Sequence, residues 1–317
     1  MPRVLVTGAT GLVGRALCPR LAEAGYRLRA ALRTDRDLPS CIAEKVVVGD
    51  ISLVNEWRPA LADVDLVVHA AARTHVLHDT PQNRALWETV NAQATRQLAH
   101  AAARAGVRRF VYLSSIKVNG EATAQRPYQA SDRPDPRDDY GRSKLQGEIY
   151  LMQAAAGTGM QAAIVRPPLV YGPGVRANFL RLMRWVDRQW PLPLGAIHNQ
   201  RSLVGVWNLC DLIETLLANP RPASGVWLVS DGEDLSTPDL IRRLGQALQR
   251  AVRLVAVPVP LLQVCAAIAG RRAEAERLCN SLTVSLTATR EALGWAPPLS
   301  TDEALMRTAA WYRAQRG

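Results

Sequence analysis

The first 25 residues constrain the fold of this chain more than any other stretch. In RVLVTGATGLVGRALCPRLAEAG, residues 3–25, three glycines (Gly8, Gly11 and Gly14) separate a short apolar run from a segment with helical character that closes at Gly25. Glycines at a strand-to-helix junction let the backbone turn sharply and approach a pyrophosphate, whose charge then lies at the helix N-terminus. The same spacing alone could be merely a sharp turn. Its position at the first strand-to-helix junction favours a dinucleotide-binding turn.

Further apolar runs follow this turn in a regular rhythm, and helical segments at 85–105 and 140–156 lie between them. Short continuous apolar strands that alternate with helices are typical of a parallel, doubly wound sheet. The sequence therefore predicts an α/β fold of the Rossmann type. The strands are expected within RLRAAL, EKVVVGD, DLVVHAAA, RRFVYLSS and QAAIVRP.

The rhythm changes after Pro167, where prolines accumulate and longer connections separate the helices. GVWLVSD is the clearest further strand in this half. We predict a dinucleotide-binding domain over residues 1–166. Residues 167–317 are expected to form mainly a smaller substrate-binding cap, with some segments returning to the main sheet.

The stretch YGRSK, residues 140–144, carries one of only three lysines among 39 basic residues. A phenol with a pKa near 10 is a poor acid–base catalyst at pH 7, but a nearby ammonium stabilises its phenolate. Tyr140 and Lys144 lie one helical turn apart and share a face, and Lys is a compact charge that Arg cannot replace there. A YxxxK spacing is common on ordinary helices. Together with the Gly-rich turn and with Ser115 at a strand end, it predicts that Tyr140 exchanges a proton with a carbinol during hydride transfer.

The end of the second strand bears on the choice of dinucleotide. A protein that binds NAD usually offers a carboxylate there to the ribose 2′-hydroxyl, but this chain has Leu32 followed by Arg33. The cation favours a 2′-phosphate and therefore NADP, although Asp35 or a backbone contact could still serve NAD. Asp50 and Ile51 end the third strand, where they could meet the adenine or simply form a turn.

The net charge of +11 could suggest a nucleic-acid partner. The arginines are spread along the whole chain, however, with no run of five or more, so a basic solvated surface is expected and no nucleic acid. His75 and His78 share a loop without a third ligand at metal spacing, and no metal is predicted.

The five cysteines form no CxxC pair and are expected to be buried thiols in a reducing compartment. A strand starting at residue 3 leaves no room for a signal peptide. The most apolar stretch, residues 254–270, holds two prolines and is too short to span a bilayer. We therefore expect a cytoplasmic protein with no membrane insertion.

Taken together, these motifs resemble the extended short-chain dehydrogenase/reductases of the nucleotide-sugar epimerase/dehydratase group. The matching stretches are TGATGLVG, HAAA at 69–72, VNAQAT, LSSIKVNG, YGRSK and RPPLVYGPG. The resemblance implies that Ser115, Tyr140 and Lys144 are catalytic, and that Lys144 also holds the nicotinamide ribose. One departure is Leu32, where NAD-bound epimerases of the family carry Asp. The expected cofactor-binding positions, with Arg33 from the argument above, are Gly8, Thr10, Gly11, Leu12, Val13, Gly14, Arg33, Asp50, Ile51, Ala70, Ala71, Asn91, Ser114, Tyr140, Lys144 and Pro167.

The same resemblance implies a substrate in which a sugar is linked to a nucleoside diphosphate, usually UDP. Ser115, Asn178 and Arg201 match substrate-contacting positions, and Arg277 resembles a further diphosphate clamp. A guanidinium fork suits phosphate geometry, although each Arg could also be an ordinary surface cation. Relatives also imply a homodimer formed through the helices at 85–105 and 140–156.

A narrower resemblance rests on SSIKVNGE, RPPLVYGPGVRANF, PLPLG, NQRSLV and LVSDGEDLST. These stretches are similar to bacterial UDP-4-keto-6-deoxy-N-acetylhexosamine 4-reductases, which in reverse are UDP-N-acetylquinovosamine dehydrogenases and supply O-antigen precursors. A UDP-hexose 4-epimerase shares every catalytic residue and remains the alternative. A redox-sensing regulator would not need Ser115, Tyr140 and Lys144. The role of Lys117, in SSIKVNG, is open.

Overall fold

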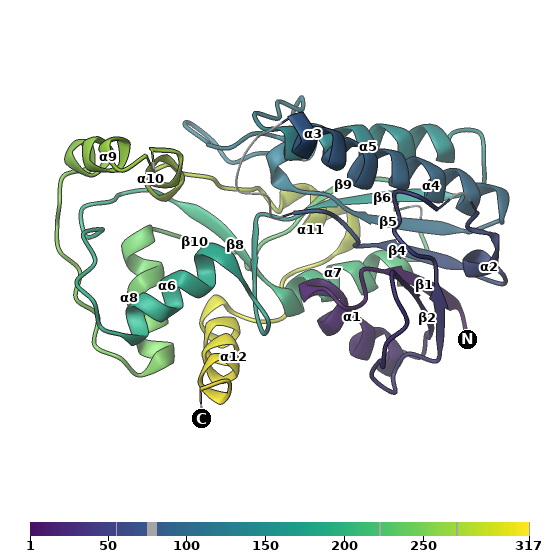
Figure 1. The fold of residues 1–317 in the computed structure, drawn as a ribbon, viewed down its shortest axis with the longest axis horizontal. Coiled ribbons are helices and arrows are strands. Elements are labelled where there is room, and N and C mark those ends of the chain that lie inside the picture. The colour runs from purple at the N-terminus through teal and green to yellow at the C-terminus, as the bar shows by residue number, and fades with distance from the viewer. Residues whose placement is uncertain (55, 75–80, 222, 271, 317) are drawn as a thin grey trace.

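The computed structural model describes residues 1–317 except 55, 75–80, 222, 271 and 317. His75 and His78 therefore lie outside the described residues. A seven-stranded parallel sheet in the order β3-β2-β1-β4-β5-β6-β9 forms the larger part of the molecule (Figure 1). This confirms the predicted α/β, doubly wound fold. Its strands are β1 (Arg3–Thr7), β2 (Arg27–Leu32), β3 (Glu44–Val47), β4 (Leu66–His69), β5 (Arg109–Leu113), β6 (Gln161–Arg166) and β9 (Gly225–Leu228).

Helices cover both faces of this sheet, which is why its strands read as continuous apolar runs. Successive side chains of a strand point to opposite faces. In β1, Val4 and Val6 pack with α1 (Leu12–Glu23) and α7 (Val206–Ala218). Leu5 points the other way, into a core with α2 (Arg58–Leu61), α4 (Ala94–Arg104) and α5 (Asp139–Ala155). The carboxyl ends of the strands remain available for a site.

The predicted helix over 85–105 is divided into three parts. It consists of α3 (Pro81–Trp87), a π-helical turn η1 (Glu88–Gln93) and α4. The prediction of one uninterrupted helix is therefore wrong in detail. Such π turns insert one extra residue and often occur at functional sites, and this one carries Asn91.

The second half of the chain builds a smaller part beside the main sheet. A three-stranded sheet of β7 (Leu169–Tyr171), β8 (Arg201–Gly205) and β10 (Asp234–Leu235) lies with α6 (Ala177–Asp187), α8 (Thr237–Leu248) and α12 (Thr301–Ala314). The helices α9 (Val259–Ile268) and α10 (Arg272–Cys279) lie at its far end (Figure 1). Strand β9, helix α7 and α11 (Thr287–Leu293) join the larger part. The boundary near residue 167 stays a prediction.

The cysteines are all free, and Cys18 and Cys210 are buried in the main core. Cys265 is exposed on α9, so the prediction of buried thiols is wrong there. No helix in the described part of the chain combines the length and apolar character needed to cross a bilayer.

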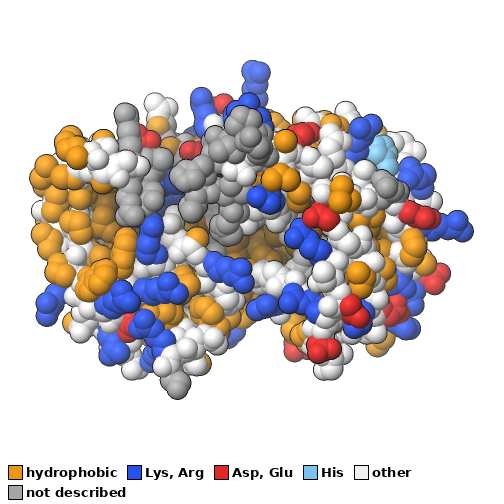
Figure 2. All heavy atoms as spheres, viewed as in Figure 1, with side chains coloured by type: hydrophobic (Ala, Val, Ile, Leu, Met, Phe, Trp, Pro, Cys, Tyr) orange, Lys and Arg blue, Asp and Glu red, His pale blue; other side chains and the backbone are white. Residues whose placement is uncertain are grey.

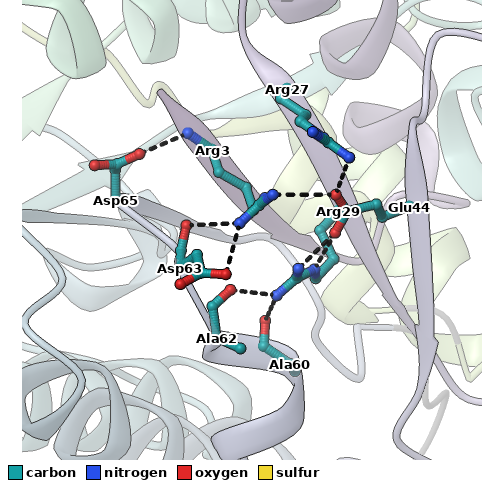
Figure 3. A network of polar contacts seen from close by, with 8 residues as sticks. All are labelled: Arg3, Arg27, Arg29, Glu44, Ala60, Ala62, Asp63 and Asp65. Carbon is teal, nitrogen blue, oxygen red and sulfur yellow. Dashed lines mark hydrogen bonds and ion pairs between the residues drawn. The ribbon is translucent and has the colours of Figure 1, made fainter. Parts of the chain in front are cut away.

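Basic side chains are scattered over the visible face of the molecule (Figure 2). Several are engaged at the amino ends of the strands, away from the expected site. Figure 3 shows Arg3, Arg27 and Arg29 converging on Glu44, and the Nε of Arg29 lies 2.7 Å from a carboxylate oxygen of Glu44. Arg29 also donates to the carbonyl oxygens of Ala60 and Ala62. These arginines hold the neighbouring strands together through Glu44. Part of the positive charge of the chain therefore has a structural role.

Candidate active site

The Gly-rich turn leaves no room for side chains where the backbone segments meet. Gly8 has φ of +75°, and a Cβ there would lie 2.7 Å from the backbone nitrogen of Ala71. A Cβ on Gly14 would lie 2.2 Å from the carbonyl oxygen of Gly8. Gly11 is the N-cap of α1, and no side chain from the described residues caps this helix end. The turn is therefore shaped as a dinucleotide phosphate site requires, with bare backbone and an open helix N-terminus.

Other predicted cofactor positions surround this turn. Thr10, Leu12 and Val13 follow Gly8 into α1, while Ala70 and Ala71 leave β4 against it. The YGPG loop also comes close, because a Cβ on Gly174 would lie 3.9 Å from the Cδ1 of Leu12. Pro167 follows β6 and its carbonyl oxygen accepts from the backbone N–H of Ile116 at 3.0 Å. The carboxyl ends of several strands thus meet around one place.

The helix α5 begins at this edge and is held there by its N-cap. A carboxylate oxygen of Asp138 accepts from the backbone N–H of Gly141 at 2.7 Å. The other oxygen pairs with Lys117, whose Nζ also lies 2.9 Å from Glu121. Lys117 therefore fixes the cap of the helix that carries Tyr140, which assigns a positioning role to a residue that the sequence left open.

The structure brings Ser115 and Tyr140 together. Tyr140 is half-buried in the first turn of α5, and Ser115 is the N-cap of a 3₁₀ turn, η2 (Ile116–Val118). Burial raises the pKa of Tyr140, the carboxylate of Asp138 raises it further, and a hydrogen bond with the Ser115 hydroxyl lowers it. The chain alone thus shifts this pKa in the direction opposite to the predicted tuning by Lys144.

Lys144 lies deeper, on the same side of α5. It is 1% exposed, and its Nζ lies 4.3 Å from the ring centroid of Tyr112. Burial lowers the pKa of Lys144 to about 7, although the carboxylate of Glu148 acts to raise it. Tyr112 stacks in turn on His69, whose pKa burial and then Lys144 lower to about 3. Of the four side chains His69, Tyr112, Tyr140 and Lys144, only Lys144 therefore has a pKa near neutral pH.

A buried ion pair that was not predicted from the sequence begins one helical turn after Lys144. Glu148 and Arg166 are each about 4% exposed, with Nε of Arg166 2.9 Å from Oε1 of Glu148. Arg166 also donates to the side-chain oxygen of Asn119 at 2.9 Å. Ser114 is buried and donates its hydroxyl to Glu148, and its predicted role toward the cofactor stays a prediction. A signal was present, since Glu148 follows Lys144 by four residues and Arg166 interrupts an apolar strand.

Asn91 also acts within the protein. Its side-chain oxygen accepts from the backbone N–H of Arg73 at 2.9 Å, and its amide donates to the Arg73 carbonyl and to Oγ of Ser143. Both amide hydrogens are therefore used. Asn91 ties the segment after β4 to α5 and positions the site rather than presenting a free donor to a cofactor.

At the end of β2, Arg33 and Asp50 meet. Their charged atoms lie 3.0 Å apart, and Arg33 is 70% exposed. Hydrogen bonds from Ser52 lower the pKa of Asp50 most, and Arg33 also contributes. Ile51 lies beside them, half-buried. The cation expected to favour NADP is therefore partly neutralised by a carboxylate, and that carboxylate could itself accept from a ribose hydroxyl.

Replacement of Arg33 tests the prediction that the chain prefers NADP to NAD. In Arg33→Ala, NADPH should bind more weakly by roughly 1.5–3 kcal/mol, because one charge-assisted phosphate contact is lost. NADH binding should change much less. Fluorescence titration of both dinucleotides measures this, with Arg36→Ala, also exposed and nearby in sequence, as control. An equal loss of affinity for NADPH and NADH would contradict the prediction of NADP.

Two of the predicted substrate residues lie close together. The guanidinium of Arg201, at the start of β8, donates to the carbonyl oxygens of Arg277 and Asn280 at 2.7 and 3.0 Å. Burial and then Arg277 lower the pKa of Arg201. Among the described residues, no carboxylate lies within ion-pair distance of either Arg. In the part of the chain that the structure describes, these two neighbouring cations lack a counter-charge and so form a suitable site for a diphosphate.

Asn178 is not placed with them by any contact. It is exposed in the first turn of α6, where its side-chain oxygen accepts from Arg181 at 3.1 Å. Its role toward substrate stays a prediction. The described residues contain no group of three metal-binding side chains.

The pKa of Lys144 predicts a dependence of stability on pH. Its value in the folded chain, about 7, is below the value of about 10.4 in an unfolded chain. Between these values the unfolded state binds more protons, so stability should rise with pH, by at most about 1.4 kcal/mol per unit. Urea unfolding of the cofactor-free protein at pH 7, 8 and 9 should show this rise. In Lys144→Met the rise should be smaller, and an identical rise in both proteins would contradict the prediction.

The sequence and the fold of this chain are similar to those of known proteins. Residues 4–229 match the NAD dependent epimerase/dehydratase family. A UDP-glucose 4-epimerase of Vibrio cholerae is 40% identical over 98% of this chain and 95% of its own length. The structure of MoeE5 in complex with UDP-glucuronic acid and NAD aligns with a TM-score of 0.79 and 25% identity over 99% of both chains.

A third relative, from Escherichia coli O157:H7, is 28% identical over 81% of this chain and 76% of its own. It is the N-acetyl-alpha-D-glucosaminyl-diphospho-ditrans,octacis-undecaprenol 4-epimerase. The fold and the site thus define a nucleotide-binding enzyme of the Rossmann type. The chain belongs to the NAD-dependent epimerase/dehydratase family and uses NAD(P), as the sequence predicted.

Proposed function

We propose that this enzyme transfers hydride at C4 of a UDP-sugar with net reduction or oxidation, as a UDP-4-keto-6-deoxy-N-acetylhexosamine 4-reductase or UDP-N-acetylquinovosamine 4-dehydrogenase. The observation that carries the proposal is the hydrogen bond of Tyr140 with Ser115, one helical turn before the buried Lys144. A phenol held by a hydroxyl and followed by an ammonium can pass a proton to or from a sugar oxygen. The dinucleotide would supply or accept the hydride at the Gly-rich turn. Ser115 orients the reacting oxygen in this proposal.

The diphosphate of the substrate would bind at Arg201 and Arg277. Neither Arg has a carboxylate within ion-pair distance among the described residues, which supports this assignment. The UDP-sugar ligand of the similar MoeE5 structure supports uridine as the nucleoside. The undecaprenyl-linked substrate of the Escherichia coli relative contains a diphosphate but no nucleoside. Arginines that bind the diphosphate would therefore not distinguish these two carriers.

The second candidate is 4-epimerisation of a UDP-hexose. It is supported by the 40% identity with the Vibrio cholerae UDP-glucose 4-epimerase. An epimerase returns the hydride to the opposite face of the same sugar and retains its NAD, whereas a reductase exchanges the dinucleotide at each turnover. The two functions therefore differ in a quantity that can be measured.

The test is incubation with UDP-4-keto-6-deoxy-N-acetylhexosamine, UDP-N-acetylquinovosamine, UDP-glucose and UDP-N-acetylglucosamine in turn. NAD(P)H absorbance and the stereochemistry of the product are followed. Stoichiometric oxidation of NAD(P)H with the 4-keto sugar would support the reductase. Inversion at C4 without a net absorbance change would support the epimerase. Absence of turnover with all four, together with salt-dependent DNA binding, would instead support a redox-sensing regulator.

We also propose a homodimer formed through α4 and α5, a cytoplasmic location and a role in O-antigen precursor synthesis. Ile149 and Met152 leave apolar surface exposed on α5, which supports an interface there. The five free cysteines are compatible with a reducing compartment.

A further inference from the structure

Helix α9 presents its apolar side chains outward. Four of its exposed positions, Leu261, Val264, Cys265 and Ile268, follow the spacing i, i+3, i+4, i+7, so they form one stripe along the helix. Pro260 and Ala267 are exposed as well. Leu261 is 52%, Val264 56% and Ile268 84% exposed. We call these four residues the outer stripe. The one polar residue of the helix, Gln263, is instead half-buried.

The opposite side of α9 packs only partly against the rest of the protein. Val259 and Leu262 pack against the core of the smaller part, but no residue of the helix is fully buried. An ordinary surface helix has the reverse arrangement, with apolar residues inward and polar residues outward. An apolar stripe exposed in this way marks a surface that contacts another phase or another molecule.

The segment that leads into α9 and the segment paired with it, which follows α6, carry exposed cations and an indole. Residues 192–195 run beside 253–255, where the backbone N–H of Leu192 donates to the carbonyl of Arg253 at 2.8 Å. Trp190, immediately before, is 49% exposed, and the guanidinium of Arg188 lies 5.1 Å from its ring centroid. Neither Arg188 nor Arg253 has a carboxylate partner among the described residues. Figure 2 shows hydrophobic side chains gathered at the end of the molecule where α9 lies in Figure 1, with basic side chains along their lower border.

We propose that the outer stripe seats this protein on the surface of an anionic lipid bilayer. Apolar side chains of a short helix would enter the headgroup boundary, and the exposed arginines and tryptophan of the two adjoining segments would lie at the interface. The helix is too short to cross the membrane. A second copy of the chain is a poorer occupant, because in a symmetric contact through this surface the arginines of the copy would meet Arg188 and Arg253. An anionic surface complements the same charges.

Sedimentation of the full chain with vesicles tests the proposal. Vesicles of phosphatidylcholine alone are compared with vesicles of phosphatidylcholine and phosphatidylglycerol in equal parts. The wild type should sediment with the anionic vesicles, and high salt should weaken this binding. The variant Leu261→Gln/Val264→Gln/Ile268→Gln should lower the partition coefficient by at least about tenfold. A control with two other exposed apolar residues replaced, Val47→Gln/Met306→Gln, should retain it.

Cys265 reports directly on the contact, because it is the one fully exposed cysteine of the five. An environment-sensitive fluorophore is attached to Cys265, and Cys41→Ser and Cys279→Ser prevent labelling elsewhere. Its emission maximum should shift to shorter wavelength when anionic vesicles are added. Far-ultraviolet circular dichroism and retained turnover of the soluble sugar would show that the variants are folded. The proposal is overturned if the wild type binds neither kind of vesicle, if the stripe and control variants lose binding equally, or if the fluorophore does not respond. It is also overturned if the stripe variant dissociates a dimer, which would make a second copy the occupant.

Discussion

Tyr140→Phe should lower the single-turnover rate of hydride transfer by roughly 100-fold or more while dinucleotide affinity stays nearly unchanged. General acid–base catalysis contributes roughly 10²–10⁴-fold, and the substitution removes the only atom of Tyr140 that can carry the proton. The ring, the start of α5 and the cap by Asp138 remain. Rapid mixing with a turnover-competent UDP-sugar measures the rate, and fluorescence titration measures dinucleotide binding.

Tyr150→Phe is the matched control, because it removes the same atom from the same helix. The hydroxyl of Tyr150 lies 3.3 Å from the side-chain nitrogen of Gln93, and the ring lies beside Arg96, so it has its own contacts outside the catalytic cluster. Its rate should stay within about twofold of the wild type. If Tyr140→Phe kept more than about a tenth of the wild-type rate, Tyr140 would not be the proton-transfer group.

The order in which the two groups titrate differs from that expected from the sequence. The chain raises the pKa of Tyr140 through burial and lowers that of Lys144 to about 7, also through burial. With rising pH, Lys144 would therefore lose its proton before Tyr140 does. Spacing on a helix can show that two residues share a face, but it cannot show how deeply each one is buried. Burial, rather than their mutual attraction, dominates both pKa shifts here.

The sequence was most informative where local chemistry decides the structure. The Gly-rich turn is read correctly because only glycine permits the close approaches at Gly8 and Gly14. The central strands are recognised because both of their faces are buried, which leaves no polar alternation. The edge strand β3 is the exception, since exposed and half-buried residues alternate along it. The short strands β7, β8 and β10 were not predicted, since their pairing is set by distant segments rather than by their own residues.

The orientation of neighbouring side chains was harder to predict. Ser114 and Ser115 both end the same strand and were both assigned to the site. In extended backbone, adjacent side chains point to opposite sides, and the structure directs Ser114 inward to Glu148 and Ser115 toward Tyr140. Helix α9 shows the same limit, because an apolar sequence predicts burial but cannot show which surface will cover it.

Glu148→Gln should destabilise the protein by about 3–5 kcal/mol, because it leaves the buried guanidinium of Arg166 without its counter-charge. The side chain keeps its size, so packing changes little and the loss is electrostatic. Equilibrium urea unfolding measures it. The substitution also removes the carboxylate that raises the pKa of Lys144. Lys144 should then lose its proton at lower pH than in the wild type, and the alkaline limb of the pH–rate profile should move in the same direction.

An exposed pair provides the control for the stability measurement. Arg137 and Asp135 are 68% and 56% exposed, and Asp135→Asn should cost at most about 1 kcal/mol because solvent screens such pairs. The double substitution Glu148→Gln/Arg166→Met separates a buried unpaired charge from simple loss of packing. Removing both charges should recover much of the stability that the single variant loses, since a buried ion pair can often be replaced by apolar side chains at little cost. If the double variant were less stable than Glu148→Gln alone, the loss would come from the hydrogen bonds to Asn119 and Ser114, and the unpaired charge of Arg166 would not be its cause.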